Sequence, residues 1–186
     1  MKIYFVRHSE VIEPYQGKYN GHIDIELSIK GKKDAFELEK KLLHVKFQKV
    51  FCSDLLRAKQ TLQMMQIDAP VVYTKALREK SWGRHEGKSF EQITQEGIVY
   101  KNFLQWIEAL DGEDMHTYMQ RVQDYFHQEI LTCKAENVLV VTHAGVIKTL
   151  ISIEEQIPLE KAFGISLGYS EYLVYDTNKG FLLPTI

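Results

Sequence analysis

Short, mostly apolar runs bounded by polar residues recur along this chain of 186 residues, and stretches with helical spacing separate them. The runs are rich in β-branched and aromatic residues and predict strands, at about residues 2–6, 49–52, 71–73 and 138–142, with two β-rich segments at about 171–175 and 180–184. Buried runs of this kind, followed by helical pattern, are typical of parallel strands. The first four runs therefore predict a parallel sheet.

Helical stretches connect these strands. Ser28 is a candidate N-cap for a helix that reaches about His44. Its apolar face is formed by Ala35, Leu38, Leu42 and Val45. Ser53 and Asp54 offer capping side chains for a second helix that starts at Leu55. Strands that alternate with helices in this way predict a layered α/β fold.

The second half of the chain holds the longer helical patterns. Residues 89–111 are predicted to be helical, with a break at Gly97. The next helix is strongly amphipathic, and its apolar face is formed by Met115, Tyr118, Met119, Val122, Tyr125, Phe126 and Ile130. We expect this stripe to pack in the core. No repeat, low-complexity tract or linker divides the chain, which predicts a single domain over residues 1–186.

The composition limits the classes of partner that the protein can bind. A formal net charge of −2 argues against nucleic-acid binding, which usually requires a strong basic excess. No apolar stretch approaches membrane-spanning length, and the N-terminus enters a strand without an apolar signal core. The two cysteines, Cys52 and Cys133, suggest a reducing compartment without disulfides. We therefore expect a cytoplasmic protein that binds neither nucleic acid nor membrane.

Two histidines follow predicted strands directly. His8 comes after the first apolar run, and His143 comes after the run at 138–142. Ligands of open α/β sheets bind at the carboxyl ends of the strands, so the two imidazoles are expected to meet at one sheet edge. The same edge is expected to hold Arg7 and Arg57, whose planar guanidinium groups bind two phosphate oxygens at once. This set predicts an anion site.

The residues at this edge suit phosphoryl transfer. A neutral imidazole is a competent nucleophile near pH 7, and a second, protonated imidazole stabilises the oxygens of a loose phosphoryl transition state. A leaving alkoxide needs a proton, and Glu79, in the loop after the third strand, is the best candidate to supply it. The seven histidines show no compact metal-ligand spacing, so we expect no metal ion and no cofactor.

Five motifs in order resemble those of the histidine phosphatases, the phosphoglycerate-mutase-like superfamily. They are Tyr4-Phe5-Val6-Arg7-His8-Ser9-Glu10, the loop at 19–28, the segment at 52–61, Leu77-Arg78-Glu79 with Trp82-Gly83 and Glu86-Gly87, and Val140-Val141-Thr142-His143-Ala144-Gly145. One such motif is weak evidence, but five in order are specific. The resemblance implies a three-layer α/β/α sandwich with a mostly parallel central sheet.

The resemblance also implies roles for single positions. His8 would carry the phosphoryl group, with Arg7, Arg57 and His143 around it. Glu79 would be the proton donor, and later the base for the attacking water. Asn20 and Gly21 match a loop that contacts the phosphoryl group or the substrate in relatives, and Ala144 follows the second histidine at the same edge. The implied substrate is a small phosphomonoester.

Two positions depart from the family pattern. Ser9 stands where glycine is commoner, so the backbone contact there is expected to differ. Pro14 stands six residues after the nucleophile, where relatives often have an asparagine that binds phosphate. We expect weaker phosphate binding from this loss, not loss of activity.

The branch of the family is suggested by spacing. Glycolytic mutases of this type have a longer interval between the acid and the second histidine, whereas the interval from Glu79 to His143 is compact here. The short chain and the Tyr19-x-Gly21-His22 loop are most similar to α-ribazole-5′-phosphate phosphatases of cobalamin assembly. The resemblance implies a metal-independent phosphomonoesterase with a phosphohistidine intermediate. The alternatives are a mutase and an inactive member that binds phosphate or a protein partner.

Other residues near the expected site have competing interpretations. His22 and His85 fall in loops beside it and are candidates for substrate contact, whereas His44, His116 and His127 are expected on solvated helix faces. Residues 100–110, which include Phe103 and Trp106, either cover the pocket and sort leaving groups or present an apolar helix face to the core.

Overall fold

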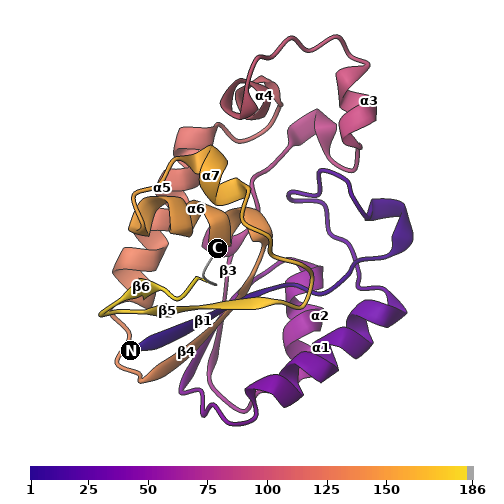
Figure 1. Ribbon diagram of the computed structural model, residues 1–186. Helices are drawn as coiled ribbons and strands as arrows, with labels where there is room; N and C mark the ends of the chain where they lie inside the picture. The colour runs from indigo at the N-terminus through magenta and orange to yellow at the C-terminus, as the bar shows by residue number, and fades with distance from the viewer. Residues whose placement is uncertain (184–186) are drawn as a thin grey trace.

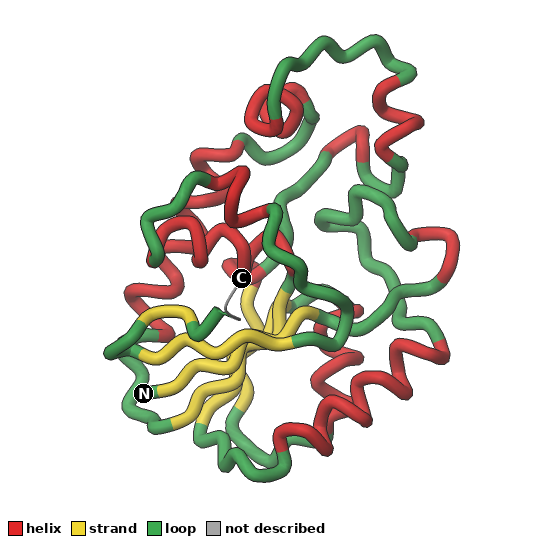
Figure 2. Tube along the Cα trace, in the orientation of Figure 1, coloured by secondary structure: helices red, strands yellow, loops and turns green. Residues whose placement is uncertain are grey.

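The computed structural model describes residues 1–183 and contains one mixed sheet (Figures 1 and 2). Its strands are β1 (Lys2–Arg7), β2 (Lys49–Ser53), β3 (Val71–Thr74), β4 (Asn137–Thr142), β5 (Tyr172–Asp176) and β6 (Gly180–Phe181). The strand order is β3-β2-β4-β1-β5-β6. The first four strands in this order pair in parallel, and β5 and β6 add an antiparallel edge. The expectation of a mostly parallel sheet is confirmed.

Helices cover both faces of the sheet (Figure 1). They are α1 (Ile29–Leu42), α2 (Leu56–Met65), α3 (Phe90–Thr94), α4 (Phe103–Ala109), α5 (Met115–Tyr125), α6 (Ala144–Glu154) and α7 (Leu159–Phe163). Four shorter turns are η1 (Glu13–Tyr15), η2 (Lys75–Leu77), η3 (Gly83–His85) and η4 (Phe126–Ile130), of which η4 continues α5 with wider, π-type turns.

The alternation of strand side chains divides the core in two. Ile3 and Phe5 point to the face covered by α5, α6 and α7, and Tyr4 and Val6 point to the face covered by α1 and α2. Both sets are buried, because a strand sends successive side chains to opposite faces. The apolar stripe of residues 115–130 packs on the first face, as its spacing predicts. Two helical layers around one sheet make the three-layer sandwich.

A third, smaller apolar cluster lies outside the sandwich. It is formed by Trp82, Ile93, Trp106, Ile107 and Leu110. The helices α3 and α4 that contribute to it lie together at the top of Figure 1. Residues 89–111 therefore form two short helices, and the predicted break at Gly97 is confirmed. Ser89 and Asn102 each cap a separate helix, and Gly97 adopts φ +78° between them.

One of the predicted helix caps is confirmed, whereas another cap and the last strand differ from the prediction. Ser28 caps α1 by accepting the Gly31 N–H at 2.9 Å, as predicted. The prediction that Ser53 and Asp54 cap α2 is wrong, because Leu56 N–H donates to the Asp24 carboxylate at 2.6 Å. The predicted strand at 180–184 is limited to β6, and residue 184 lies outside the described residues.

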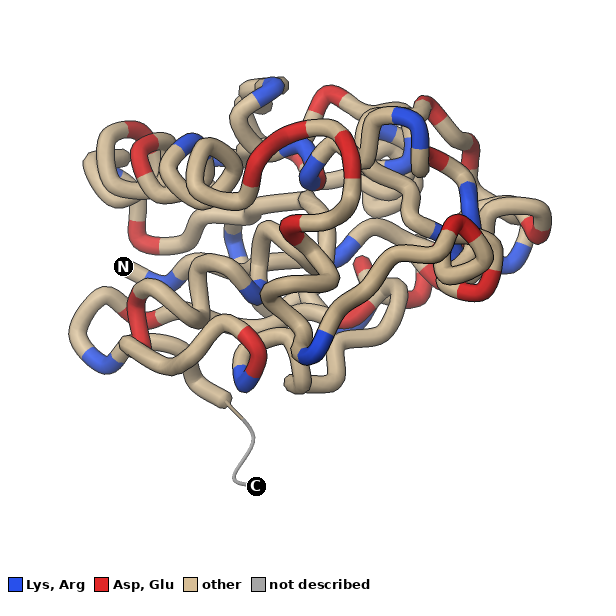
Figure 3. Tube along the Cα trace, turned by 90° about the horizontal axis from the view of Figure 1, so that it is seen from above, with Lys and Arg blue, Asp and Glu red and all other residues tan. Residues whose placement is uncertain are grey.

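Positive and negative residues are interspersed over the trace in the view from above (Figure 3). This mixture fits the net charge of −2. Within residues 1–183, no helix has the length and apolar character needed to cross a membrane.

Candidate active site

The two sheet-edge histidines lie side by side. β1 and β4 are parallel neighbours, with Arg7 opposite Thr142, so the next residue of each strand is a histidine. The backbone N–H of His8 donates to the Thr142 carbonyl at 2.9 Å. The ring centroids of His8 and His143 are 5.1 Å apart, with an angle of 61° between the planes. The strand pairing itself therefore brings the two imidazoles together.

The His8 ring is held as a neutral imidazole. Its Nδ1 lies 2.8 Å from the carbonyl oxygen of Ser9, an acceptor, so Nδ1 carries the proton and donates it. Burial lowers the pKa of His8 well below its usual value, and the positive charges of Arg57 and Arg7 lower it further. At neutral pH the ring thus has a lone pair on Nε2.

The His143 ring is fixed through both nitrogens. Arg57 Nε donates to Nδ1 at 3.3 Å, so the proton is on Nε2, which lies 2.8 Å from the Ser53 hydroxyl. Burial lowers the pKa of His143 well below its usual value, as do the nearby positive charges of Arg57 and Arg7. The protein groups alone keep this imidazole neutral. A phosphoryl dianion would oppose those positive charges and favour the protonated form.

Arg57 is a buried cation that joins His143 to the loop at 20–23. Its NH2 group donates to the carbonyls of Gly21 at 2.7 Å and Asn20 at 3.1 Å, and NH1 donates to Ile23 O at 2.9 Å. Burial lowers the pKa of Arg57 to about 10, so the guanidinium stays charged at neutral pH. These bonds leave Arg57 in one orientation beside the imidazoles.

Arg7 directly precedes His8 at the end of β1. Its NH1 donates to the Leu167 carbonyl at 2.6 Å, and its guanidinium carbon lies 4.1 Å from the centre of the Tyr169 ring. Its buried Nε has no hydrogen-bond partner among residues 1–183. Buried donors are normally paired, so an unpaired guanidinium N–H beside a nucleophile suits an anionic ligand.

Glu79 reaches the same edge from the loop after β3. Its Oε2 accepts the Gly145 N–H at 2.9 Å, at the N-terminus of α6. Its Oε1 accepts the Tyr118 hydroxyl at 2.9 Å and the Lys80 N–H at 3.1 Å. One oxygen has two donors and the other has one, so Oε2 is the oxygen with room to carry a proton.

A cavity of about 160 Å³ joins most of these groups. Its lining residues are Arg7, His8, Lys18, Tyr19, Asn20, Glu79, Trp82, Ala144 and Tyr169. His143 and Arg57 are not in the lining: the His143 ring packs against His8, and Arg57 donates to His143. Gly21 is not in the lining. A Cβ there would lie 2.1 Å from Lys80 O, so Gly21 permits the loop to pack against the acid-bearing segment.

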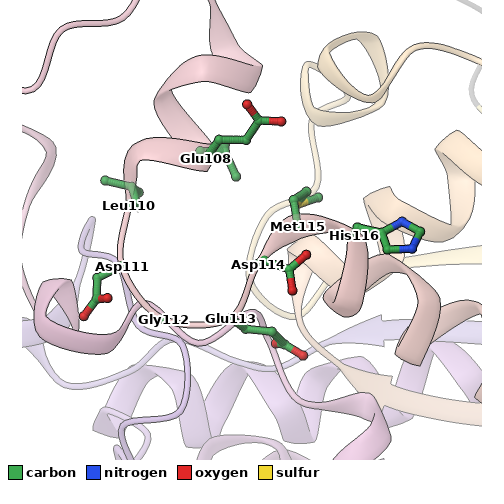
Figure 4. Close-up of a pocket in the computed structure, with 9 residues that line it drawn as sticks. Glu108, Leu110, Asp111, Gly112, Glu113, Asp114, Met115 and His116 are labelled. Carbon is green, nitrogen blue, oxygen red and sulfur yellow. The ribbon is translucent and has the colours of Figure 1, made fainter.

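A larger cavity has the opposite chemistry. It measures about 380 Å³ and lies between α4 and α5, where Figure 4 shows Glu108, Asp111, Glu113 and Asp114 around it. Carboxylates repel a phosphate dianion, so this cavity does not suit such a ligand. Among residues 1–183, no three side chains of His, Cys, Asp or Glu are grouped as metal ligands.

The remaining histidines lie away from the cavity lining. His85 is fully buried, where it accepts the Asp111 N–H at 2.9 Å and lies 3.2 Å from the Glu96 carboxylate. It therefore stabilises its own loop. His22 is half-buried outside the lining, and His44, His116 and His127 are exposed, as expected.

Residues 100–110 combine features of both interpretations. Trp106 is buried in the third cluster, and its indole N–H donates to the Tyr19 hydroxyl at 2.7 Å. Tyr19 lines the cavity and packs edge-on against Trp82, with 5.1 Å between the ring centres. The segment thus supports the aromatic wall of the cavity from behind.

Sequence reasoning missed three residues that organise the site. Tyr118 donates to Glu79, Tyr169 covers Arg7, and the Ser53 hydroxyl faces His143 instead of capping a helix. Tyr118 belongs to the stripe that the pattern assigns to the core. Its hydroxyl stands in a stripe that is otherwise apolar. A buried phenol normally has a hydrogen-bond partner, so this hydroxyl was the one sequence signal that predicted a buried bond.

Comparison with known proteins gives a consistent picture. The family model described as "Histidine phosphatase superfamily (branch 1)" matches residues 3–182. The Escherichia coli K12 protein named adenosylcobalamin/alpha-ribazole phosphatase is 28% identical over 189 residues, which cover 97% of this chain and 92% of that protein.

Two further relatives show the range of similar proteins. The crystal structure of the alpha-ribazole phosphatase from Shigella flexneri has a TM-score of 0.83 and 27% identity, covering 96% of this chain and 92% of that one. A 2,3-bisphosphoglycerate-dependent phosphoglycerate mutase of Gloeobacter violaceus is 26% identical, covering 88% of this chain and 80% of that protein.

Proposed function

This chain belongs to the histidine phosphatase superfamily (branch 1) and is a phosphoric monoester hydrolase of that family, and on this premise we propose that it acts through a phosphohistidine at His8 without a metal ion. The observation that carries the proposal is the His8 ring itself. Its Nδ1 donates to Ser9 O, so Nε2 presents a lone pair in a cavity that Arg7 also lines, with His143 packed against the His8 ring and Arg57 bonded to His143.

The first step forms the covalent intermediate. His8 Nε2 attacks phosphorus, the bond from phosphorus to the ester oxygen breaks, and the leaving oxygen takes the proton of Glu79. Arg7 and Arg57 supply positive charge to the three equatorial oxygens of the loose transition state, and His143 donates the N–H that it carries on Nε2. The products of this step are an alcohol, phosphohistidine and an ionised Glu79.

The second step hydrolyses the phosphohistidine and regenerates the free enzyme. Glu79, now a carboxylate, takes a proton from water as the oxygen attacks phosphorus and the bond to His8 Nε2 breaks. Inorganic phosphate leaves, and Glu79 is protonated again. The cationic groups of the site supply the charge stabilisation that a divalent ion gives other phosphatases, which is why we propose metal independence.

The intermediate is the test of this mechanism. We expect p-nitrophenyl phosphate to be hydrolysed at the same rate with and without EDTA. Quenching with alkali and detergent during turnover of ³²P-labelled substrate should trap a base-stable, acid-labile phosphoenzyme, and His8→Ala should abolish both the label and turnover. An active His8→Ala variant would exclude His8 as the nucleophile. A well-folded wild-type protein with no turnover would instead favour the inactive, phosphate-binding alternative.

Two substitutions test the neighbouring roles. Glu79→Gln should slow hydrolysis most for poor leaving groups, and an equal loss for good and poor leaving groups would remove Glu79 as the acid. Arg57→Lys removes the planar fork that also bonds three loop carbonyls, so we expect kcat/KM to fall by on the order of 10²-fold. Arg84→Lys, at an exposed arginine, is the control.

We propose α-ribazole-5′-phosphate as the substrate to test first, because relatives named for it match almost the full chain. A screen of phosphorylated metabolites should place its kcat/KM at the top, and a clearly better sugar phosphate or nucleotide would replace it. Mutase activity is the second candidate, favoured by the similarity to a phosphoglycerate mutase. Conversion of 3-phosphoglycerate to 2-phosphoglycerate after priming with 2,3-bisphosphoglycerate would support it.

A further inference from the structure

The segment at 167–171, between α7 and β5, forms a turn that lies against the nucleophile. The backbone carbonyl of Glu171, its last residue, accepts the backbone N–H of Arg7 at 3.0 Å, which aligns the turn with the end of β1. The hydroxyl of Ser170, in the middle of the turn, lies 2.6 Å from the hydroxyl of Ser9. Ser9 is fully buried. The turn is therefore tied to the residue that directly follows His8 in the chain.

The same turn makes two contacts with the Arg7 guanidinium. Leu167 O accepts from NH1 at 2.6 Å, and the Tyr169 ring covers the guanidinium face at 4.1 Å. The Tyr169 ring also lies 5.5 Å from the His8 ring, between ring centres. A guanidinium that is bonded at one corner and stacked on one face keeps a fixed plane, and its unpaired Nε then points in a fixed direction.

The backbone of Ser170 requires an anchor. Its φ is +56°, in the left-handed region that residues with a Cβ adopt only infrequently. Such a conformation persists where surrounding contacts fix it, and these sites cluster where function demands a set geometry. The Ser9 hydroxyl is the side-chain contact that holds Ser170. Ser9 also stands where the family motif more commonly has glycine, which has no hydroxyl.

We propose that Ser9 is a positioning residue for phosphate binding. Its hydroxyl holds Ser170 in the left-handed conformation, the turn then holds Tyr169 over Arg7, and Arg7 presents its unpaired edge to the phosphoryl group. This inference rests on the proposed function, in which Arg7 binds the phosphoryl oxygens. The structural alternative is that the Ser9 side chain only fills buried space beside β1.

The first experiment measures inorganic phosphate as a competitive inhibitor of p-nitrophenyl phosphate hydrolysis. Ser9→Ala should raise the Ki of phosphate roughly 3- to 10-fold, the effect of one neutral hydrogen bond. Ser152→Ala is the matched control. It removes another serine hydroxyl, bonded to Ile157 O at 2.8 Å, and should leave the Ki unchanged. A Ser9→Ala variant with the wild-type Ki would overturn the proposal.

Two substitutions of Ser170 distinguish the effect of its hydroxyl from the effect of its backbone conformation. Ser170→Ala and Ser170→Gly both remove the hydroxyl, but glycine adopts φ +56° without strain. If the bond to Ser9 fixes the backbone of residue 170, Ser170→Ala raises the Ki, and Ser9→Ala adds nothing in the Ser170→Gly background. If Ser9→Ala still raises the Ki in the Ser170→Gly background, its effect does not pass through Ser170 and the inference is wrong.

Combining Ser9→Ala with Arg7→Lys tests whether Ser9 affects the Ki of phosphate through Arg7. A lysine has no plane to orient, so Ser9→Ala should cause no further rise in Ki there, and Tyr169→Leu should behave like Ser9→Ala. A purely space-filling role would give additive losses and would contradict the proposal. If Arg7→Lys itself leaves the Ki unchanged, it is the proposed phosphate-binding role of Arg7 that fails.

Discussion

The backbone N–H of Gly145 donates to Glu79 Oε2 at 2.9 Å, and the two residues are so close that no side chain fits between them. A Cβ at position 145 would lie 2.1 Å from Oε1 of Glu79 and 2.8 Å from its carboxyl carbon. Residue 145 has ordinary helical backbone in the first turn of α6, so glycine is required there by the carboxylate and not by the backbone.

Gly145→Ala should therefore displace the Glu79 carboxylate while the fold stays intact. Misplacing a catalytic group by about 1 Å costs on the order of 10²-fold in rate, and we expect that loss in kcat for poor leaving groups. Gly164→Ala is the control, because a Cβ there approaches only carbonyl oxygens, at 3.3 and 3.6 Å. Steady-state rates of both variants with an alkyl phosphate check the prediction. A fully active Gly145→Ala enzyme would contradict it.

Tyr118→Phe should reduce proton donation without unfolding the protein. The phenol donates to Glu79 Oε1 at 2.9 Å from a position that is 1% exposed, and a hydrogen bond to a charged group contributes roughly 1.5–3 kcal/mol. We expect a loss of roughly tenfold or more for alkyl phosphates and a smaller loss for p-nitrophenyl phosphate, whose leaving group needs less protonation.

A matched control exists on β5. Tyr175 donates to the Glu154 carboxylate at 3.1 Å, away from the candidate site. Tyr175→Phe removes the same kind of bond and should leave the ratio of the two rates unchanged. Equal losses for both substrates in Tyr118→Phe would indicate that Tyr118 only stabilises the fold.

The parts that sequence predicted are those encoded locally. An apolar run that ends at a polar residue marks where β1 and β4 stop, which is why the placement of His8 and His143 at one edge followed from the pattern. The stripe at 115–130 likewise predicted the packing of α5. Both signals lie within a few residues of the feature they predict.

The parts that sequence did not predict depend on partners far apart in the chain. Asp24 caps α2 from 32 residues away, and the cap that Ser53 appeared to offer is used for His143 instead. Nothing near Tyr118 in the chain indicates that its hydroxyl bonds Glu79, 39 residues earlier. The break at Gly97 was predicted, but the helical extent of residues 89–111 was overestimated, because α3 and α4 are short helices that pack in the third apolar cluster.

The two site histidines should make stability depend on pH. Burial, with help from nearby arginines, lowers the pKa of both His8 and His143 well below 6.5 in the folded protein. Between 6.5 and those lowered values the unfolded chain binds more protons than the folded one, so the free energy of unfolding falls as pH falls. At pH 5.5 each histidine therefore lowers the free energy of unfolding by on the order of 1 kcal/mol.

Urea unfolding at pH 7.5 and 5.5 measures this difference. We expect His8→Asn to reduce the pH-dependent loss by on the order of 1 kcal/mol relative to the wild type. His44→Asn, at an exposed position, should leave it unchanged. An identical pH dependence in His8→Asn and the wild type would show that the folded ring protonates as readily as a free one.

Glu86 connects the acid-bearing segment to the loop that holds Arg57. Its carboxylate accepts four backbone N–H groups, from Gly21 at 2.8 Å, His22 at 2.8 Å, Trp82 at 3.0 Å and Ile23 at 3.3 Å. The carbonyls of the same loop accept from Arg57. The loop at 20–23 thus bonds an anion with its N–H groups and a cation with its carbonyls.

Glu86→Gln should weaken both stability and phosphate binding. A glutamine has one acceptor oxygen in place of two, so at least one of the half-buried N–H groups loses its partner, at a cost of about 1–3 kcal/mol. The loosened loop no longer fixes Arg57, so the Ki of inorganic phosphate should rise together with the loss of stability. Glu91→Gln, at an exposed residue, controls for the change in charge. Urea unfolding and phosphate inhibition of both variants decide the matter, because a Glu86→Gln protein that is less stable but binds phosphate normally would show that the loop does not orient Arg57.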